Sequence, residues 1–149
     1  MSQSFMERAL ELAKEAAIAG EVPVGAVIVS SEGEILAETR NRIVELKDAT
    51  AHAEVLAIRG AGARLSSERL IDCDLYVTLE PCTMCAGAIS FARLRRVYYG
   101  CSDPKGGGVE QGACFFDQPT CHHKPEIYGG ICETEAAQIL RDFFKEKRE

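Results

Sequence analysis

Two short stretches of the sequence carry side chains that can bind a metal ion and transfer protons. Residues 50–57 read TAHAEVLA and place His52 two positions before Glu54. Residues 79–88 read LEPCTMCAGA and place Cys82 three positions before Cys85. Imidazole and thiolate groups are ligands that zinc prefers, and a carboxylate beside a metal ion can act as an acid or a base. The two stretches together predict a metal site with a proton shuttle.

The two cysteines are expected at the start of a helix over residues 81–94, with Pro81 at its first helical position. Residues three apart on a helix lie on one side, so both sulfur atoms can face the same ion. The unpaired N–H groups at a helix N-terminus stabilise thiolates, the form that binds metal. For this motif alone, a thioredoxin-like redox pair remains an alternative.

His52 is expected in the first turn of the preceding helix, over residues 51–62, and supplies a third ligand. Zinc prefers four ligands, so three protein ligands leave one position open for water, whose pKa the metal would lower toward neutrality. Glu54 is then the natural base, because it faces the water without being forced to coordinate. Glu80 more plausibly orients backbone or a ligand. Cys101 is an alternative fourth ligand, which would make the site structural.

The composition limits the class of protein. A chain of 149 residues with 46% hydrophobic and 27% charged residues fits one globular domain, residues 1–149. No apolar run is long enough to span a bilayer, and the first residues lack the pattern of a secretory signal, so a cytoplasmic protein is expected. Seven cysteines, an odd number, argue against a disulfide framework. The net charge of −6 does not indicate nucleic-acid binding, although basic residues cluster at 93–96 and 145–148.

The hydrophobic periodicity predicts an α/β fold, in which five strands form a mixed sheet with helices packed on its faces. Further helices are expected over residues 5–20 and 133–147, besides the two that carry the motifs. Strands are expected over residues 22–30, 34–42, 73–80, 95–100 and 125–130. Each motif falls at a strand-to-helix junction, where sites form in open α/β sheets.

The sequence His52-Ala53-Glu54, together with Pro81-Cys82-Thr83-Met84-Cys85, resembles the signature of the zinc-dependent cytidine/deoxycytidylate deaminase superfamily. Nearly the whole chain is similar to the bacterial tRNA-specific adenosine deaminases, the TadA family. The similar stretches are EVPVGAVIV at 21–29, Asn41, DATAHAE at 48–54, LYVTLEPCTMCAGAI at 75–89, RVYYGCSDPKGG at 96–107 and the terminal LRDFFKEKR.

The resemblance implies a three-layer, cytidine-deaminase-like fold with one Zn²⁺ per subunit and water in the fourth position. It implies a hydrolase that converts the wobble adenosine of a tRNA anticodon, in bacteria mainly an arginine tRNA, to inosine with release of ammonia. It also implies a homodimer that contacts the anticodon stem-loop, and no membrane partner. A deaminase of a free base or nucleoside, such as guanine or cytosine, and a non-catalytic structural zinc module remain alternatives.

The resemblance also assigns residues. It makes His52, Cys82 and Cys85 the zinc ligands and Glu54 the catalytic proton shuttle. For substrate binding it implies that Val22, Pro23 and Val24 help to wall the base pocket and that Asn41 contacts the flipped nucleotide. It places Asp103 and Lys105 in a loop that approaches the neighbouring nucleotides, and Phe143 and Phe144 on the terminal helix that touches the anticodon loop. Ala53 is also expected to bind substrate. The terminal KEKRE carries two acids among its bases, and no role is assigned to Cys101, Cys114, Cys121, His122 and His123.

Overall fold

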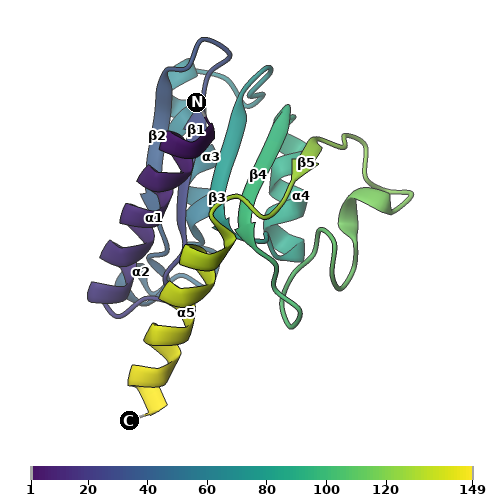
Figure 1. Ribbon diagram of the computed structural model, residues 1–149. Coiled ribbons are helices and arrows are strands. Elements are labelled where there is room, and N and C mark those ends of the chain that lie inside the picture. Colours follow the sequence, from purple (N-terminus) through teal and green to yellow (C-terminus); the bar gives the residue numbers. More distant parts are fainter. Residues whose placement is uncertain (1, 149) are drawn as a thin grey trace.

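The structure is a computed structural model that describes residues 2–148, with side chains described from Phe5 onward. The helices are α1 (Ser2–Ile18), α2 (Ile43–Leu46), α3 (Ala53–Leu65), α4 (Thr83–Ala92), the 3₁₀ helix η1 (Phe115–Asp117) and α5 (Glu133–Arg148). The strands are β1 (Gly25–Val29), β2 (Ile35–Arg40), β3 (Asp74–Leu79), β4 (Arg96–Cys101) and β5 (Glu126–Tyr128). Figure 1 shows helices on both faces of one central sheet.

The sheet is mixed, with the strand order β2-β1-β3-β4-β5. β1 pairs antiparallel with both β2 and β3, whereas β3, β4 and β5 run parallel. The five-stranded mixed sheet expected from the sequence is therefore confirmed. Because β3 and β4 are parallel, the segments that follow them emerge at the same edge of the sheet, where the cysteine motif lies.

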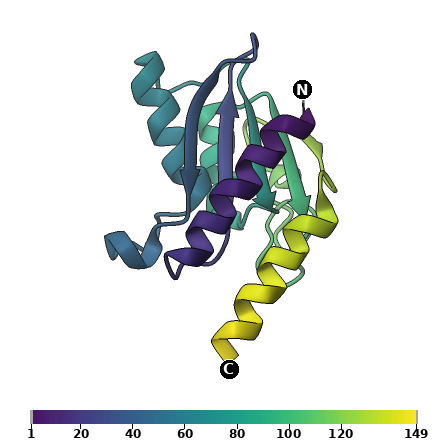
Figure 2. The same ribbon diagram turned by 60° about the vertical axis from the view of Figure 1, so that its left-hand side comes forward.

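Alternating side chains divide the core into two layers. Ala26 and Ile28 of β1 pack with the small residues of α3 and α4, while Val27 and Val29 pack against α1. α1 and α5 lie side by side on that second face, and the end of α5 projects beyond the sheet (Figure 2). α1 lies very close to β1: a Cβ at Gly25 would come 2.0 Å from the carbonyl oxygen of Ala9. The three-layer arrangement is therefore as expected.

Two local features differ from the sequence-based expectation. α2 was not predicted; its first amides, those of Val44 and Glu45, donate to the buried carboxylate of Glu21 at 3.1 and 2.8 Å. Pro81 was expected at the first helical position of α4, and this is wrong: Cys82 is the N-cap, with extended backbone (φ −73°, ψ 175°), and Pro81 precedes it.

The residues that the structure describes include no helix long and apolar enough to cross a membrane.

Candidate metal centre and active site

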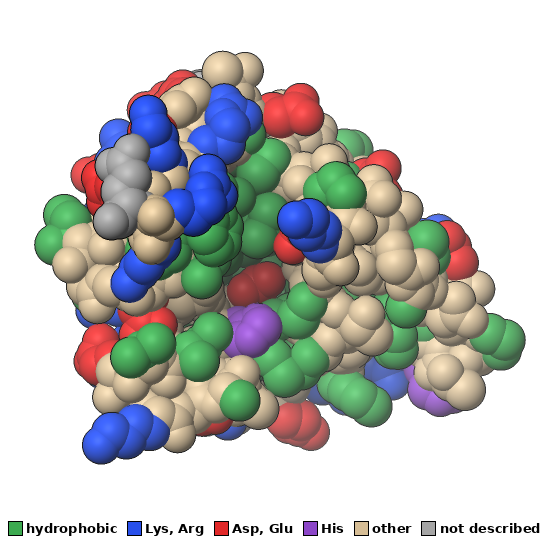
Figure 3. Space-filling view, turned by 90° about the horizontal axis from the view of Figure 1, so that it is seen from below, with side chains coloured by type: hydrophobic (Ala, Val, Ile, Leu, Met, Phe, Trp, Pro, Cys, Tyr) green, Lys and Arg blue, Asp and Glu red, His purple; other side chains and the backbone are tan. Residues whose placement is uncertain are grey.

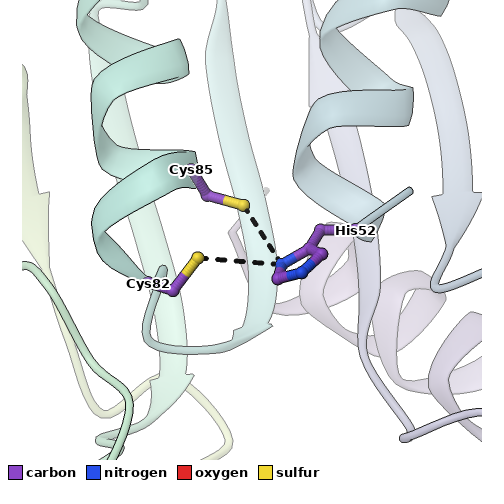
Figure 4. Close-up of side chains that lie close together, drawn as sticks. All are labelled: His52, Cys82 and Cys85. Atoms are coloured by element: carbon purple, nitrogen blue, oxygen red, sulfur yellow. Dashed lines mark hydrogen bonds between the residues drawn. The ribbon is translucent and has the colours of Figure 1, made fainter. Parts of the chain in front are cut away.

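The N-termini of α3 and α4 bring the two sequence motifs together. His52 is the N-cap of α3 and Cys82 the N-cap of α4, while Cys85 lies in the first turn of α4. The two helices pack against each other on one face of the sheet. In Figure 4 the imidazole ring of His52 points between the two sulfur atoms.

The three side chains have the spacing of a zinc site. The Nδ1 atom of His52 lies 3.7 Å from the sulfur of Cys82 and 3.5 Å from that of Cys85. Zinc–sulfur and zinc–nitrogen bonds in a tetrahedron place such ligand atoms about 3.6 Å apart. All three ligand atoms fall within 4.8 Å of one another. The donor set and its geometry therefore fit Zn²⁺.

The electrostatics of this cluster favour thiolate at its outer cysteine. The hydrogen bond that Cys82 accepts from Cys85, followed by the one that it accepts from His52, lowers the pKa of Cys82 to about 4. The same contact with Cys82, together with burial, raises the pKa of Cys85. The hydrogen bond to Cys82 also raises the pKa of His52. The cluster thus already favours one cysteine in the thiolate form that binds metal.

A fourth protein ligand is not found among the described residues. Within residues 2–148, His52, Cys82 and Cys85 form the one group of three metal-ligating side chains that lie close enough together. Cys101, the alternative fourth ligand, packs on the opposite face of the sheet with α1, and its thiol donates to the carbonyl oxygen of Thr78 at 3.8 Å. The ligand set matches an open catalytic site rather than a closed structural one.

Glu54 lies beside this centre and is almost completely buried, with 3% of its surface exposed. It belongs to the first turn of α3, and its carboxylate is within hydrogen-bonding reach of Cys85. Burial raises the pKa of Glu54 to about 7. A carboxyl group with a pKa near neutrality can both accept and return a proton, which is what a shuttle requires.

Asn41 connects the hairpin of β1 and β2 to the start of α3. Its side-chain oxygen accepts from the amide of Ala53 at 2.8 Å, and its amide group donates to the carbonyl oxygen of Val22 at 3.0 Å. A side-chain amide has two donor hydrogens and two acceptor positions, so one of each remains for a ligand. Asn41 therefore holds Val22 and Ala53 in place while it keeps a free donor and acceptor.

A cleft of about 990 Å³ lies between the segment after β4 and the last turns of α5. One end of it is lined by Val22, whose carbonyl oxygen accepts from Asn41, and by Leu79, which lies just before the cysteine motif in the sequence. The other end is lined by Lys105, Arg141, Phe144, Lys145 and Arg148, with Ser102, Asp103, Gly106, Gln138, Leu140 and Asp142 completing the walls. Figure 3 shows a hollow that has a histidine and an acidic side chain at its floor and Lys and Arg side chains gathered on one rim.

The structure sorts the substrate-binding residues that the resemblance implied. Val22, Asp103, Lys105 and Phe144 line the cleft. Others face inward: Pro23, Val24, Ala53 and Phe143 are all buried, the last with 8% of its surface exposed. Phe143 packs edge-on against Phe144 and lies beneath the ammonium group of Lys147. Of the two phenylalanines, only Phe144, 44% exposed, presents its ring at the surface.

The basic cluster at residues 93–96 lies away from this cleft. Arg96 begins β4, so the cluster sits at the opposite edge of the sheet from the cysteine motif. Arg95 makes two hydrogen bonds, of 3.0 and 2.9 Å, to the carboxylate of Asp74. Arg93 donates to the carbonyl oxygen of His122. Arg93 and Arg95 are thus engaged by partners within the fold, whereas Arg141, which no sequence motif indicates, lines the cleft.

The Cys121-His122-His123 segment does not form a second metal site among the described residues. The thiol of Cys121 donates to the carbonyl oxygen of His123 at 3.2 Å, and Nε2 of His123 lies 2.6 Å from the carbonyl oxygen of Leu94. These contacts fix the chain between η1 and β5.

Comparisons with known proteins agree with this site. Residues 1–101 match the family model described as the cytidine and deoxycytidylate deaminase zinc-binding region. A tRNA-specific adenosine deaminase of Agrobacterium fabrum is 60% identical over 97% of this chain and 94% of its own length. A solved structure from studies of A-to-I editing by tRNA:A34 deaminases at the wobble position is 59% identical, covers 92% of this chain and 99% of its own, and superposes with a TM-score of 0.90.

A guanine deaminase of Bacillus subtilis is also similar. It is 40% identical, covers 84% of this chain and 82% of its own, and has a TM-score of 0.66. The family match covers more than half of the chain and includes His52, Glu54, Cys82 and Cys85. The chain belongs to the zinc-binding cytidine and deoxycytidylate deaminase family and, within it, to the tRNA-specific adenosine deaminases.

Proposed function

We propose that this protein hydrolytically deaminates the wobble adenosine of a tRNA anticodon to inosine and releases ammonia. The observation that carries this proposal is the combination of a three-ligand zinc site and a buried Glu54 with a cleft that has basic side chains and is lined at one end by Val22 and Leu79. The family to which the chain belongs supports the same reaction. An arginine tRNA is the substrate that the resemblance predicts, and a tRNA substrate is consistent with a single cytoplasmic deaminase domain.

His52, Cys82 and Cys85 would hold the zinc ion. When bound there, zinc supplies a Lewis acid that makes hydroxide available from water near neutral pH. The neighbouring residues exclude bulk water: Ala53, Cys85 and Ala86 are fully buried. The reacting base therefore meets a site of low dielectric constant, where each charge in the site acts more strongly.

Glu54 moves the protons of the reaction. It takes a proton from the attacking water and delivers it to N1 of adenine as oxygen adds to C6. It then takes the proton of the new hydroxyl group on C6 and gives it to the exocyclic amine; the C6–N bond breaks, ammonia leaves and C6 becomes the carbonyl carbon of inosine. One water is consumed and one ammonia is released for each inosine formed, so atoms and protons balance.

The cleft would hold the RNA strand around the extruded base. Extrusion from a single-stranded loop costs only a few kcal/mol. Asn41 can contact the nucleotide with its free donor and acceptor, and Val22 lies against the base. Phe144 offers a ring on which a neighbouring base can stack, and Lys105, Lys145 and the nearby arginines can pair with phosphates.

A deamination assay tests the proposed function. Purified, zinc-loaded protein is incubated with an anticodon stem-loop carrying a wobble adenosine, and separately with free adenosine, guanine and cytosine. We expect inosine to form in the stem-loop alone. Guanine deamination is the second candidate, since a guanine deaminase of known structure is 40% identical. Ammonia from guanine, with the stem-loop unchanged, would favour that candidate and overturn the proposed substrate.

We also propose that the protein is a homodimer that uses the outer face of α4. Met84, Ala88 and Phe91 recur at helical spacing, and Met84 and Phe91 are 39% and 80% exposed. An exposed aromatic ring in such a stripe has the character of an interface anchor.

Phe91→Glu is expected to weaken dimerisation at least about tenfold, because it places a charge in an apolar contact. Sedimentation equilibrium measures the change. Ile18→Glu is the matched control, since Ile18 is 88% exposed at the end of α1 and should leave the dimer intact. A wild-type protein that is already monomeric, or an unchanged dimer in Phe91→Glu, would contradict the proposed interface.

A further inference from the structure

Glu80 is a buried carboxylate that the deamination chemistry does not use. It lies between β3 and Pro81, and 2% of its surface is exposed. Its partners are four backbone amides of one loop, residues 103–111. Oε1 accepts from Asp103 at 3.0 Å, and Oε2 accepts from Val109, Glu110 and Gln111 at 3.1, 2.8 and 3.0 Å.

The two oxygens of Glu80 therefore hold the beginning and the end of loop 103–111. The contact is so close that a Cβ at Gly107 would come 2.6 Å from the carboxylate. On the other side, the amide of Gly108 donates to the carbonyl oxygen of Pro81 at 2.8 Å, and a Cβ at Gly108 would come 2.5 Å from the amide nitrogen of Thr83. The loop is thus fixed against the turn that carries Cys82.

The tip of the same loop forms one wall of the cleft. The carboxylate of Asp103 accepts from the amides of Lys105 and Gly106 at 3.2 and 3.0 Å, which shapes a tight turn. Asp103 is therefore engaged within the loop, and Lys105 is left as its charged group on the cleft. Glu80 thus connects the turn that carries Cys82 to the cleft wall that carries Lys105. It does so only through hydrogen bonds that its carboxylate accepts from backbone amides.

We propose that Glu80 is a positioning residue for the RNA substrate, which it serves by holding loop 103–111 in the conformation that faces α5 across the cleft. This inference rests on the proposed function. Glu80 touches neither the metal ligands' side chains nor the reacting base, so its contribution is to binding. If loop 103–111 adopts this conformation in only a fraction of the molecules, the apparent dissociation constant for RNA equals the intrinsic constant divided by that fraction.

Glu80→Gln tests the role with little change in shape. The glutamine side chain has one oxygen, which can accept from the backbone amides of Val109, Glu110 and Gln111. Its NH₂ group then faces the backbone amide of Asp103, and two donors cannot form a hydrogen bond with each other. We expect the KM for the stem-loop to rise about tenfold, since one charge-assisted hydrogen bond is lost. The kcat should stay within about twofold, because transition-state contacts are unchanged. Bound zinc should remain stoichiometric, and hydrogen exchange should accelerate in residues 103–111.

Two further variants separate positioning from general stability. Gly107→Ala keeps the carboxylate, but its Cβ would come 2.6 Å from that group and 2.7 Å from the carbonyl oxygen of Asp103, so it should displace the loop from Glu80 and raise KM in the same way. Asp74→Asn is the matched control: it removes a buried carboxylate, 8% exposed, at the other end of β3, where Arg95 is its partner. It should lower the melting temperature and leave KM and the exchange of loop 103–111 unchanged.

The outcomes are distinguishable. A raised KM with faster exchange in loop 103–111 for Glu80→Gln, and neither change for Asp74→Asn, supports the positioning role. An active wild type with an unchanged KM in Glu80→Gln and Gly107→Ala overturns this role and leaves the proposed function intact. A wild-type protein that leaves the stem-loop unmodified overturns the proposed function and this inference with it.

Discussion

Glu54→Gln is expected to reduce kcat at least about 10⁴-fold while the protein retains stoichiometric zinc. In the proposed mechanism the same carboxylate serves proton transfer to N1 and to the leaving amine, and glutamine can accept no proton at either step. Because the amide keeps the shape of the side chain, the three zinc ligands stay in place. Single-turnover kinetics on the anticodon stem-loop and metal analysis by mass spectrometry measure the two quantities together.

Stability provides an internal control for this variant. Glu54 is 3% exposed, and replacing a buried carboxylate with a neutral amide removes a group that is costly to bury. The melting temperature of Glu54→Gln should therefore equal or exceed that of the wild type, a trade-off found at functional sites. Normal turnover in a zinc-replete Glu54→Gln or Glu54→Ala protein would remove Glu54 from the mechanism.

Loss of Cys85 should act through the metal instead. Cys85→Ala leaves His52 and Cys82 as two ligands, too few for a stable tetrahedral site. We expect zinc content and turnover to fall to near zero. If free zinc is present at about 1,000 times its dissociation constant, its loss removes about 4 kcal/mol of stabilisation. For a chain of this length that corresponds to a melting temperature lower by about 10 °C.

Two comparisons make this result specific. Wild-type protein treated with a chelator should melt at the temperature of Cys85→Ala, because both lack the metal. Cys101→Ala also removes a buried thiol, 4% exposed, but on the other face of the sheet, and it should keep its zinc. Stoichiometric zinc in Cys85→Ala would show that the ligand set is wrong, and loss of zinc from Cys101→Ala would restore the four-ligand structural alternative.

The architecture was predictable from the sequence because its determinants are local and periodic. The runs of apolar and β-branched residues in β1 and β3 and the small residues of α3 and α4 define strands and helices by themselves. The zinc centre was predictable from local signals as well: Cys82 and Cys85 open α4 directly after β3, and His52 is the N-cap of α3, although α3 follows α2 and not a strand. The predicted start of α4 at Pro81 lies two positions before its first helical residue, Thr83, because helix boundaries depend on backbone geometry that residue type only biases.

Other features depend on partners that are distant in the sequence. α2 has only four residues, and its first amides bind Glu21, more than twenty positions earlier. Glu80 could be expected to orient backbone, but nothing in its neighbourhood indicates that loop 103–111 returns to it. The sequence shows a basic cluster at 93–96, and only the fold reveals that Asp74 is the partner of Arg95. Phe143 and Phe144 are adjacent in the sequence, and only the packing of α5 distinguishes them.

The division between the centre and the borders of the site has an evolutionary consequence. The proposed proton shuttle and the zinc ligands lie at the N-termini of α3 and α4. These two helices pack against each other and against one face of the sheet. The cleft walls, by contrast, belong to one loop and to the free end of α5, which projects beyond the sheet (Figures 1 and 2). Mutations can accumulate at the positions of these walls that make no contact with Glu80 or with the turn that carries Cys82, without disturbing the hydrolytic centre. A fold of this kind can diversify its substrates, from a free purine to a nucleotide within RNA, while it inherits the same chemistry.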